Sequence, residues 1–565
     1  MIMKKFAALS LLVVAAGVVH GMSSVKGVGE CRPNIVFFLA DDQSKFDHSA
    51  YGNEKAPTPV TGKFAKEGVV FERMFTGQAI CAPSRSMLYT GLNPIRNGCF
   101  LNHTQVRPGV KSITKYMGNL GYEVILAGKS HVAPDEQFQW TKRFQPVKVP
   151  GLPRPWIPVE EMEAFMKNPG DKPFCMIVAS EFPHSPHIKD TSFGVEEVKV
   201  QSFIADTPDA RKSYTQYYQS IVEKEKEFEA VLGMIDKHGL RDDTVVFYAD
   251  DHGGKRGKFT VYDSGLNVAF MVRWPGKIKP GRTGALSSFT DFVPTAIELA
   301  GGTVPAGIDG KSLLPVLTRG AVNQHDYVYG VAHNQGIQQR HVFPQRSVHD
   351  GRYHYIVNFN SLEKIESDRT AGKTIDYFFE HGAKKHSSQP TEELYDTQVD
   401  PDELVNLAGR EETVSIKAKL REQLFQWLEM QGDYLGEDGP VVFLQGKQHE
   451  LDEQAEKYGY KIPAALVGSL NGLKNDPHAI TGEDAKAAVV ADPVVPGDGK
   501  PQASNKNATS VPEGAPIEDF LENKRKYCTK QGKEFSETKY LKSFAKLDAN
   551  KDGLLSAGEW SPGKK

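Results

Sequence analysis

The stretch PNIVFFLADD, residues 33–42, decides the fold class that this sequence predicts. Its apolar run is short and unbroken, and it ends in the pair Asp41 and Asp42. Such a run is typical of a strand buried on both faces, as in a parallel sheet, because neither face carries polar side chains. The two aspartates are therefore expected at the carboxyl end of a buried strand.

Similar runs recur along the chain. Residues 123–127, 174–179 and 244–249 are short and mostly apolar, and charged or imidazole side chains follow each of them. Helical stretches such as residues 213–238 lie between them. This alternation predicts an α/β fold, with a large, mostly parallel sheet sandwiched by helices. Because ligands of open α/β sheets bind outside the carboxyl ends of the strands, the side chains that follow the runs are expected to share one site.

The remaining sequence predicts smaller parts after a catalytic domain at residues 32–320. Residues 325–435 combine strand-like patches with a helix near residues 411–430, and they predict a small α+β subdomain packed on the first region. Residues 477–516 are rich in Pro, Ala, Gly, Asp and Lys and are interpreted as a flexible linker. Residues 517–565 form a separate C-terminal segment.

The N-terminal residues indicate where the protein is located, and the net charge of the chain limits the kinds of partner that it can bind. Lys4 and Lys5, the apolar run at residues 6–19 and Gly21 predict a signal peptide over residues 1–21. A periplasmic or secreted protein with no stable membrane insertion after cleavage is expected, and a retained membrane anchor is the alternative. The formal net charge of −3 argues against nucleic acid as a partner of the whole chain.

The chain has five cysteines, which is an odd number for an exported protein. Modification of Cys81 would leave Cys31, Cys99, Cys175 and Cys528. These four could form one or two disulfides, or all four could be free and buried.

The strongest motif is Cys81-Ala82-Pro83-Ser84-Arg85, which continues to Thr90-Gly91. It resembles the signature of the formylglycine-dependent sulfatases of the alkaline phosphatase superfamily. The resemblance implies an alkaline-phosphatase-like fold, and it implies that a formylglycine-generating enzyme oxidises Cys81. The hydrated aldehyde then attacks sulfur with one hydroxyl and expels sulfate with the help of the other. Cys81 and Arg85 are therefore expected in the catalytic site.

Two other segments resemble the metal site of that family. Asp41 and Asp42, together with Asp251, His252 and Cys81, are the implied ligands, and carboxylate oxygens suit Ca²⁺ or Mg²⁺. Asp250 competes with Asp251 when the residues are considered alone, but the family pattern favours Asp251 and His252.

Three further stretches resemble the family's sulfate-binding positions. Gly128-Lys129-Ser130-His131 implies that Lys129 binds sulfate and that His131 acts as a base. His184, in a Pro-His-Ser-Pro run, is implied to bind sulfate and protonate the leaving group, with His187 as the alternative. Lys258 matches the last basic position. Together these groups would surround one small anionic centre.

Within the family the sequence is most similar to the sulfamidases, the heparan N-sulfatases. The supporting stretches are residues 128–134, 343–348 and 393–396, the last followed by Asp400-Pro401. The chain departs from the sulfamidase pattern at His252 and Lys258, where Asn and Arg are expected. The resemblance implies removal of sulfate from a sulfated oligo- or polysaccharide, with N-sulfoglucosamine as the first expectation. An O-sulfatase acting on another sulfated polysaccharide is the alternative. A phosphatase or phosphonate hydrolase of the superfamily, or an inactive carbohydrate-binding protein, is more remote.

The C-terminal segment carries the spacing of an EF-hand loop. Its ligand positions fall at Asp548, Asn550, Asp552, Leu554 and Glu559, where Leu554 stands at the position that contributes a backbone carbonyl. A second bound Ca²⁺ is therefore expected.

Overall fold

The computed structural model describes residues 32–254, 257–334, 342–359, 390–433, 435, 515–516 and 554–555. The chain divides into two compact units, residues 1–485 and 486–565. In the second unit the described residues are the short strands β16 (Ala515–Pro516) and β17 (Leu554–Leu555), which pair in antiparallel fashion. The predicted signal peptide, all of the predicted linker except Ala515–Pro516, and the EF-hand positions Asp548, Asn550, Asp552 and Glu559 lie outside the described residues. Within the described part of the chain, no helix has the length and apolar character that crossing a membrane requires.

The first unit is built on an eight-stranded central sheet with the strand order β10-β2-β9-β7-β1-β6-β4-β5. Strands β7, β1, β6, β4 and β5 run parallel, and β9 is antiparallel to both of its neighbours. The predicted mostly parallel α/β sheet is confirmed. The bounds are β1 (Asn34–Ala40), β2 (Val69–Phe71), β4 (Glu123–Gly128), β5 (Lys142–Phe144), β6 (Phe174–Ala179), β7 (Thr244–Asp250), β9 (Phe270–Arg273) and β10 (Gly281–Thr283).

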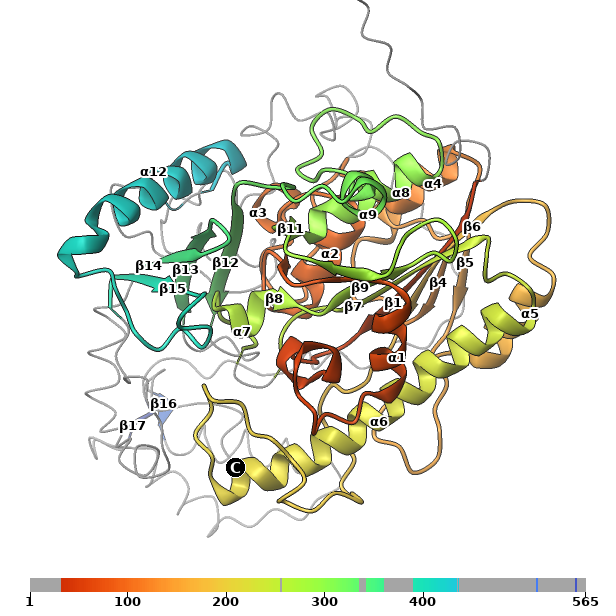
Figure 1. Cartoon of the computed structure of the whole chain (residues 1–565), viewed down its shortest axis with the longest axis horizontal. Helices are drawn as coiled ribbons and strands as arrows, with labels where there is room; N and C mark the ends of the chain where they lie inside the picture. Colours follow the sequence, from red (N-terminus) through yellow and green to blue (C-terminus); the bar gives the residue numbers. More distant parts are fainter. Residues whose placement is uncertain are drawn as a thin grey trace, which may run out of the picture. The chain divides into compact units, whose positions relative to one another are not determined.

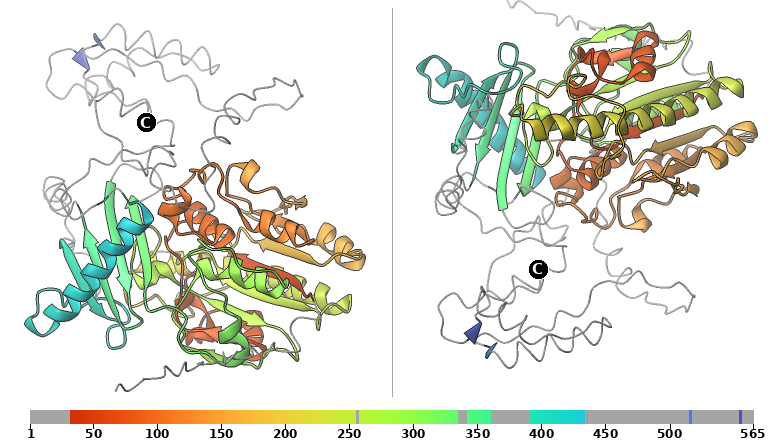
Figure 2. Two further views of the ribbon diagram at one scale, coloured as in Figure 1. Left: turned by 90° about the horizontal axis from the view of Figure 1, so that it is seen from above. Right: turned by 90° about the horizontal axis from the view of Figure 1, so that it is seen from below.

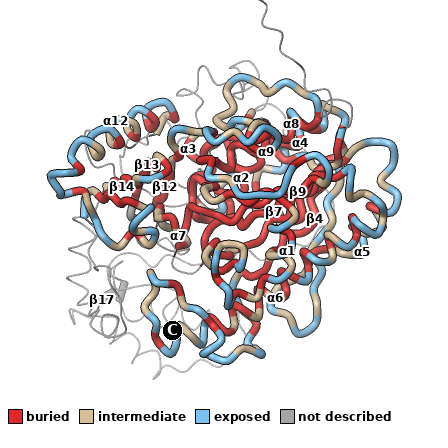
Figure 3. Tube along the Cα trace, viewed as in Figure 1, coloured by how far each residue is buried: buried red, intermediate tan, exposed pale blue. Residues whose placement is uncertain are grey.

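Helices cover both faces of the central sheet (Figure 1 and Figure 2). Alternate residues of β1 separate the two cores, because successive side chains of a strand point to opposite faces. Phe37 belongs to the core with α2 (Cys81–Thr90), α4 (Ile113–Asn119), α8 (Phe292–Leu299) and α9 (Leu314–Arg319). Phe38 belongs to the core with α1 (Pro59–Glu67), α5 (Val159–Lys167) and α6 (Pro208–Lys237). Figure 3 shows that burial is concentrated on the strands between these layers.

Helix α6 begins at Pro208 rather than at residue 213, where the sequence analysis placed its start. Its first turn is polar, so the apolar pattern does not mark it. The signals that do are proline at the start of the helix and Thr207, whose side chain accepts a hydrogen bond from the backbone of Ala210.

The C-terminal sheet is an antiparallel meander of β12 (Val328–Asn334), β13 (Val342–His349), β14 (Tyr353–Asn358) and β15 (Glu392–Asp396). Helix α12 (Val414–Gln431) packs on it, and Tyr329 stacks on Trp427 with ring centroids 4.3 Å apart. This sheet lies in the same unit as the central sheet and joins it directly, since the backbone N–H of Val331 donates to the carbonyl of Gly77 at 2.8 Å. The predicted α+β region is therefore present as a smaller antiparallel sheet with a helix.

Short elements connect these layers. A three-stranded sheet contains β11 (Ser287–Ser288), β3 (Met74–Phe75) and β8 (Asn267–Val268). The short helices are α3 (Pro94–Asn97), α7 (Asp263–Leu266) and the 3₁₀ turns at Lys45–Asp47, Ser49–Tyr51, Asp135–Gln137, Phe289–Asp291 and Glu411–Thr413.

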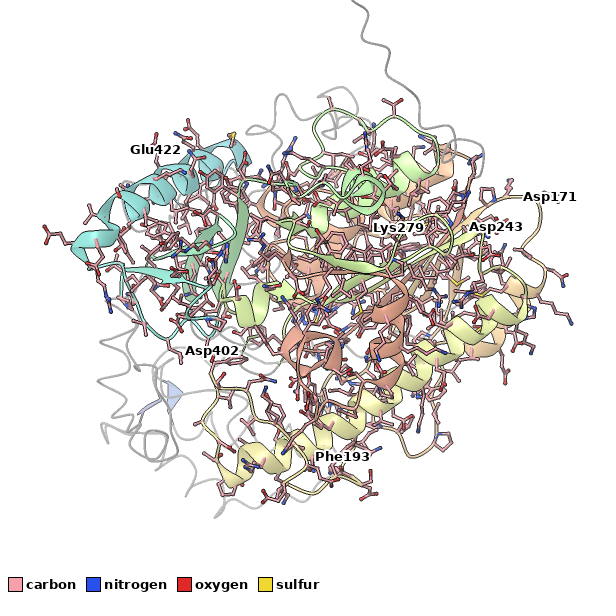
Figure 4. The ribbon with its side chains drawn as sticks, in the orientation of Figure 1. Asp171, Phe193, Asp243, Lys279, Asp402 and Glu422 are labelled. Atoms are coloured by element: carbon pink, nitrogen blue, oxygen red, sulfur yellow. The ribbon has the colours of Figure 1, made fainter. Side chains whose placement is uncertain are left out.

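The direction of the parallel strands locates the site. Asp171 and Asp243 precede β6 and β7, and Figure 4 labels both on one side of the ribbon, at the amino ends of the strands. The carboxyl ends of β1, β4, β6 and β7 therefore lie at the opposite edge, toward the C-terminal sheet.

Candidate active site

The predicted side chains follow the carboxyl ends of four neighbouring strands, β7, β1, β6 and β4. Strand β1 leads into Asp41 and Asp42, and β7 leads into Asp251 and His252. Asp42 adopts a left-handed backbone conformation, with φ of +64°. This turn breaks the strand alternation that would point consecutive side chains apart, so both aspartates face the same group of residues.

Helix α2 presents the predicted nucleophile. Cys81 is its first residue and Arg85 follows about one turn later on the same face, and both are fully buried. The Sγ of Cys81 lies 3.6 Å from Asp41 Oδ1. Burial alone would raise the pKa of the Cys81 thiol, but the charges of Lys129 and His252 hold that pKa well below its ordinary value. Such a cationic surrounding at a helix N-terminus is typical of reactive cysteines.

Three permanent cations face the three carboxylates of the site. Arg85 Nη2 lies 3.0 Å from Asp251 Oδ2 and 3.4 Å from Asp41 Oδ1. Lys129 Nζ lies 2.5 Å from Asp41 Oδ2, and Lys258 Nζ lies 2.7 Å from Asp42 Oδ2. Burial would raise the pKa of Asp41, but Lys129 and Arg85 hold that pKa below its usual range. Burial raises the pKa of Asp251 to about 7, and the neighbouring charge of Asp41 adds to this rise.

One ring nitrogen of His252 points toward Asp42 and Cys81. Its Nδ1 lies 3.0 Å from the carbonyl oxygen of Gly253, to which it donates, so the neutral ring offers Nε2 as an acceptor. That Nε2 lies 3.1 Å from Asp42 Oδ1 and 3.4 Å from Cys81 Sγ. Burial disfavours the charged ring, but Asp251 and Cys81 raise its pKa to about 9. A ring locked to a backbone carbonyl and aimed at carboxylates has the arrangement of a metal-binding histidine.

The structure distinguishes Asp251 from Asp250. Asp250 ends β7 on the other side, where its carboxylate lies 2.9 Å from His48 Nε2 and accepts from the Tyr248 hydroxyl at 3.1 Å. Asp251 instead faces Arg85 and accepts from the backbone N–H of Asp42 at 3.1 Å.

His184 joins the group, and His187 does not. His184 Nε2 lies 3.3 Å from Lys258 Nζ and 3.4 Å from Asp42 Oδ2. The ring of His187 packs on Tyr217 of α6, with centroids 5.4 Å apart.

His131 brings in residues that the sequence analysis missed. Its Nε2 lies 2.9 Å from Nδ1 of His103, and Nε2 of His103 lies 3.0 Å from the amide nitrogen of Asn102. Arg154, which lies 2.7 Å from His184 Nδ1, was also missed. These residues stand in loops without a recognisable motif, so only their position in space links them to the site.

Two glycines allow the backbone segments of the site to approach closely. A Cβ on Gly254 would lie 2.0 Å from the carbonyl oxygen of Asp42. A Cβ on Gly128, which has φ of +96°, would lie 2.2 Å from the carbonyl oxygen of Ala179. Larger residues would push apart the strand ends that carry Asp42 and Lys129.

The donor set fits a cation. One ligand atom from each of Asp41, Cys81, Asp251 and His252 lies within 4.8 Å of the others, and the same holds for Asp41, Asp42, Cys81 and His184. Carboxylate oxygens are the ligands of Ca²⁺ and Mg²⁺. The group of residues can therefore hold a hard divalent ion beside Cys81.

The other described cysteines are not part of this group. Cys99 and Cys175 are free, buried thiols, and burial raises their pKa values to about 11 and about 12. Buried, protonated thiols of this kind are inert. Cys31 and Cys528 lie outside the described residues.

Comparison with known proteins identifies relatives of this chain. Residues 33–302 match the sulfatase family, and residues 252–370 match the family described as N-sulphoglucosamine sulphohydrolase, C-terminal. The chain is 44% identical over 447 residues to an ulvan-active sulfatase of Formosa agariphila, covering 78% of this chain and 89% of that protein. It is 24% identical to the N-sulphoglucosamine sulphohydrolase of Homo sapiens, over 71% of this chain and 91% of that one.

The fold is also shared with solved structures. A 2-O GAG sulfatase superposes with a TM-score of 0.59 at 22% identity, covering 72% of this chain and 95% of that chain. With the fold, the sequence relatives and the grouped strand-end residues in agreement, we conclude that this chain belongs to the sulfatase family and is an enzyme that hydrolyses sulfate esters.

Proposed function

We propose that the chain removes sulfate from a sulfated polysaccharide or its oligosaccharides, using a formylglycine made from Cys81 and one Ca²⁺, with Mg²⁺ as an alternative ion. One observation carries this proposal. The Cys81 thiol stands at a helix start between three carboxylates, two of them fully buried, and three permanent cations.

The charges of the group support the cation. Asp41, Asp42 and Asp251 are matched by Arg85, Lys129 and Lys258, so the group is close to neutral by itself. Burial raises the pKa of Asp251 to about 7, so a neighbouring divalent ion would favour its ionised form. A divalent ion would keep all three carboxylates ionised and leave the pocket positive, which suits a sulfate ester. When bound, the ion supplies Lewis-acid polarisation of a sulfate oxygen.

The side chains then divide the work. One hydroxyl of the hydrated residue 81 attacks sulfur, and Arg85, Lys129 and Lys258 stabilise the charge on the transferring group. His184, beside Lys258, is the proton donor to the leaving oxygen. His131 accepts the proton of the second hydroxyl, which expels sulfate and restores the aldehyde.

The sequence relatives change the first expected substrate from N-sulfoglucosamine to an O-sulfated polysaccharide. The 44% identity to an ulvan-active sulfatase favours a sulfated polysaccharide of that type, and therefore the O-sulfatase alternative of the sequence analysis. The heparan N-sulfatase assignment rests on a relative of 24% identity and on the match at residues 252–370, so it becomes the second candidate.

Two measurements test this function. Mass analysis of the peptide that contains residue 81 should find the aldehyde when the chain is produced with a formylglycine-generating enzyme. Sulfate release from ulvan oligosaccharides should then exceed release from N-sulfoglucosamine oligosaccharides, and chelation should abolish both. An unmodified cysteine in a fully active enzyme would refute the mechanism, and faster release of N-sulfate would restore the second candidate.

The two ends of the chain add further proposals. The N-terminal segment directs export to the periplasm or the medium, where the enzyme meets its substrate.

The EF-hand loop of residues 548–559 binds a second Ca²⁺ independently of catalysis. A chain ending near residue 480 should keep its rate on a small sulfate ester and lose one Ca²⁺ per molecule. Loss of that rate in a folded, truncated chain would place the tail at the active site.

A further inference from the structure

A second histidine stands against His131. His103 lies in the loop after α3, and its Nδ1 is 2.9 Å from His131 Nε2, with the rings 4.8 Å apart at 40°. His103 is exposed, whereas His131 is partly buried. The pair therefore reaches from the surface of the protein to the group around Cys81.

The loop fixes the orientation of His103. Asn102 Oδ1 accepts from the backbone N–H of Ala82 at 3.4 Å, which turns the amide nitrogen of Asn102 toward His103 Nε2 at 3.0 Å. Nε2 of His103 thus faces the Asn102 amide, and its Nδ1 faces Nε2 of His131. A continuous chain of contacts thus links the residue next to Cys81 to the imidazole of His131.

The backbone on both sides of this contact is unusual. His103 has φ of +62° and His131 has φ of +54°. Residues other than glycine seldom adopt this conformation, and where they do the surrounding structure holds them there, often at functional sites. Two histidines in this conformation that face one another indicate that the contact is built into both loops.

We propose that His103 is a positioning residue for His131, and that it holds the His131 imidazole in the orientation from which it serves the residue-81 nucleophile. This inference rests on the role proposed above for His131. Burial and the neighbouring His131 lower the pKa of His103, which favours the neutral ring that the contact requires. Because His103 is exposed, direct contact with the sugar is the competing role, and the test separates the two.

The test uses a deletion, a rescue and a control in one loop. His103→Gly removes the imidazole at a position where φ is +62°, so it adds no backbone strain. His103→Asn returns a polar group near the position of Nδ1, and asparagine tolerates this backbone conformation. Gln105→Ala is the matched control, since Gln105 is exposed in the same loop.

The measurements are kcat and KM on a small aryl sulfate and on a sulfated oligosaccharide, with the melting temperature as a check of folding. We expect His103→Gly to lower kcat about ten- to a hundred-fold with KM unchanged, because a displaced catalytic group loses that much. His103→Asn should recover most of the loss, and Gln105→Ala should match the wild type. A KM raised on the oligosaccharide alone, with unchanged kcat, would show sugar contact and overturn the proposal, as would an asparagine variant no better than the glycine variant.

Crystal structures of the wild type and of His103→Gly give a second readout that needs no turnover. The ring of His131 should leave its position in the variant, and an unmoved ring would overturn the inference. A wild-type enzyme with no activity on any sulfate ester would refute the proposed function, and the two crystal structures would still decide the role of His103.

Discussion

Among the described residues of the first unit, two groups of acids and imidazoles invite comparison, and one of them resembles a catalytic centre. The site cluster contains Asp41, Asp42, Asp251 and His252 beside Cys81. The interface cluster contains Asp263, His354 and Glu403, where α7 meets the C-terminal sheet. The interface cluster is buried, as are Asp41, Cys81, Asp251 and His252, whereas Asp42 is partly buried. In each of the two buried sets, one ligand atom per residue lies within 4.8 Å of the others.

Their internal contacts differ. In the interface cluster His354 Nδ1 lies 2.5 Å from Glu403 Oε1, and the other oxygen of Glu403 accepts from the backbone N–H of Asp263 at 2.7 Å. The short distance between His354 Nδ1 and Glu403 Oε1 indicates a charge-assisted hydrogen bond, so a proton already joins the imidazole and the carboxylate. Burial opposes the charged ring, but Glu403 raises the pKa of His354.

The site cluster is not closed in this way. Its shortest contact between an imidazole and a carboxylate is 3.1 Å, from His252 to Asp42, and its carboxylates face lysine and arginine side chains together with a thiol. The comparison teaches that acids and histidines at metal-like spacing do not by themselves mark a reactive site. What distinguishes the site cluster is the presence of separate cations and of a thiol at the start of a helix.

The interface cluster has a structural task. It joins α7 to β14 and to the loop after β15, and nearby the Tyr262 hydroxyl donates to Glu393 at 2.9 Å. These contacts tie the C-terminal sheet to the segment that carries Lys258. We therefore expect changes in this cluster to affect stability, and changes in the site cluster to affect turnover.

The largest effect is expected at Cys81. Cys81→Ala should reduce sulfate release to the background rate, because the side chain that forms the covalent intermediate is gone. The melting temperature should change little, since a small buried side chain is replaced by another. Measurable turnover in Cys81→Ala would mean that another group is the nucleophile, and the site cluster would lose its main distinction.

A swap of neighbouring residues sharpens the comparison. Asp251→Asn should lower kcat about a hundred-fold or more, since a carboxylate that faces Arg85 and the nucleophile is lost. Asp250→Asn should leave kcat nearly unchanged and lower the free energy of unfolding by about 3 kcal/mol, because its buried pair with His48 is broken. Kinetics and urea unfolding of both variants test this, and the reverse pattern would shift the assignment by one residue.

The interface cluster should show the opposite behaviour. His354→Gln removes the imidazole that is bonded to the buried Glu403 carboxylate and takes a positive charge away from Asp263. The free energy of unfolding should therefore fall by about 3 kcal/mol. The kcat of the folded variant should match the wild type. His252→Gln is the contrasting variant and should lose turnover instead. A large fall of kcat in folded His354→Gln would show that the interface cluster takes part in catalysis.

The smallest effect is expected in the pH dependence of stability. The folded pKa of His354 is raised above 6.5, so its contribution is complete below pH 6.5 and is lost as the pH rises through the raised value. Burial lowers the folded pKa of His349 to about 4, so its contribution is present above pH 6.5 and is lost as the pH falls toward 4. Melting temperatures across this range, compared with those of His354→Gln and His349→Gln, test both signs. A wild-type advantage over His354→Gln that grew above pH 6.5 would contradict a charged His354.

Much of the site could be predicted from local patterns. Apolar runs that end in charged residues place Asp41, Lys129 and Asp251 at strand ends, and the cysteine motif places Cys81 and Arg85 on one helix face. Parallel strands then bring these ends together, whatever the loops do. Those loops escaped prediction, because no periodicity marks a residue such as His103.

The sequence by itself determined the α/β sheet, because burial patterns are local properties of the chain, and its resemblance to the sulfatases predicted the nucleophile and the charged residues of the site. Only the tertiary structure showed the different partners of Asp250 and Asp251, brought His103 to His131, and separated a closed interface cluster from an open site cluster. These outcomes depend on side chains far apart in sequence meeting at distances near 3 Å, and no local pattern encodes such distances.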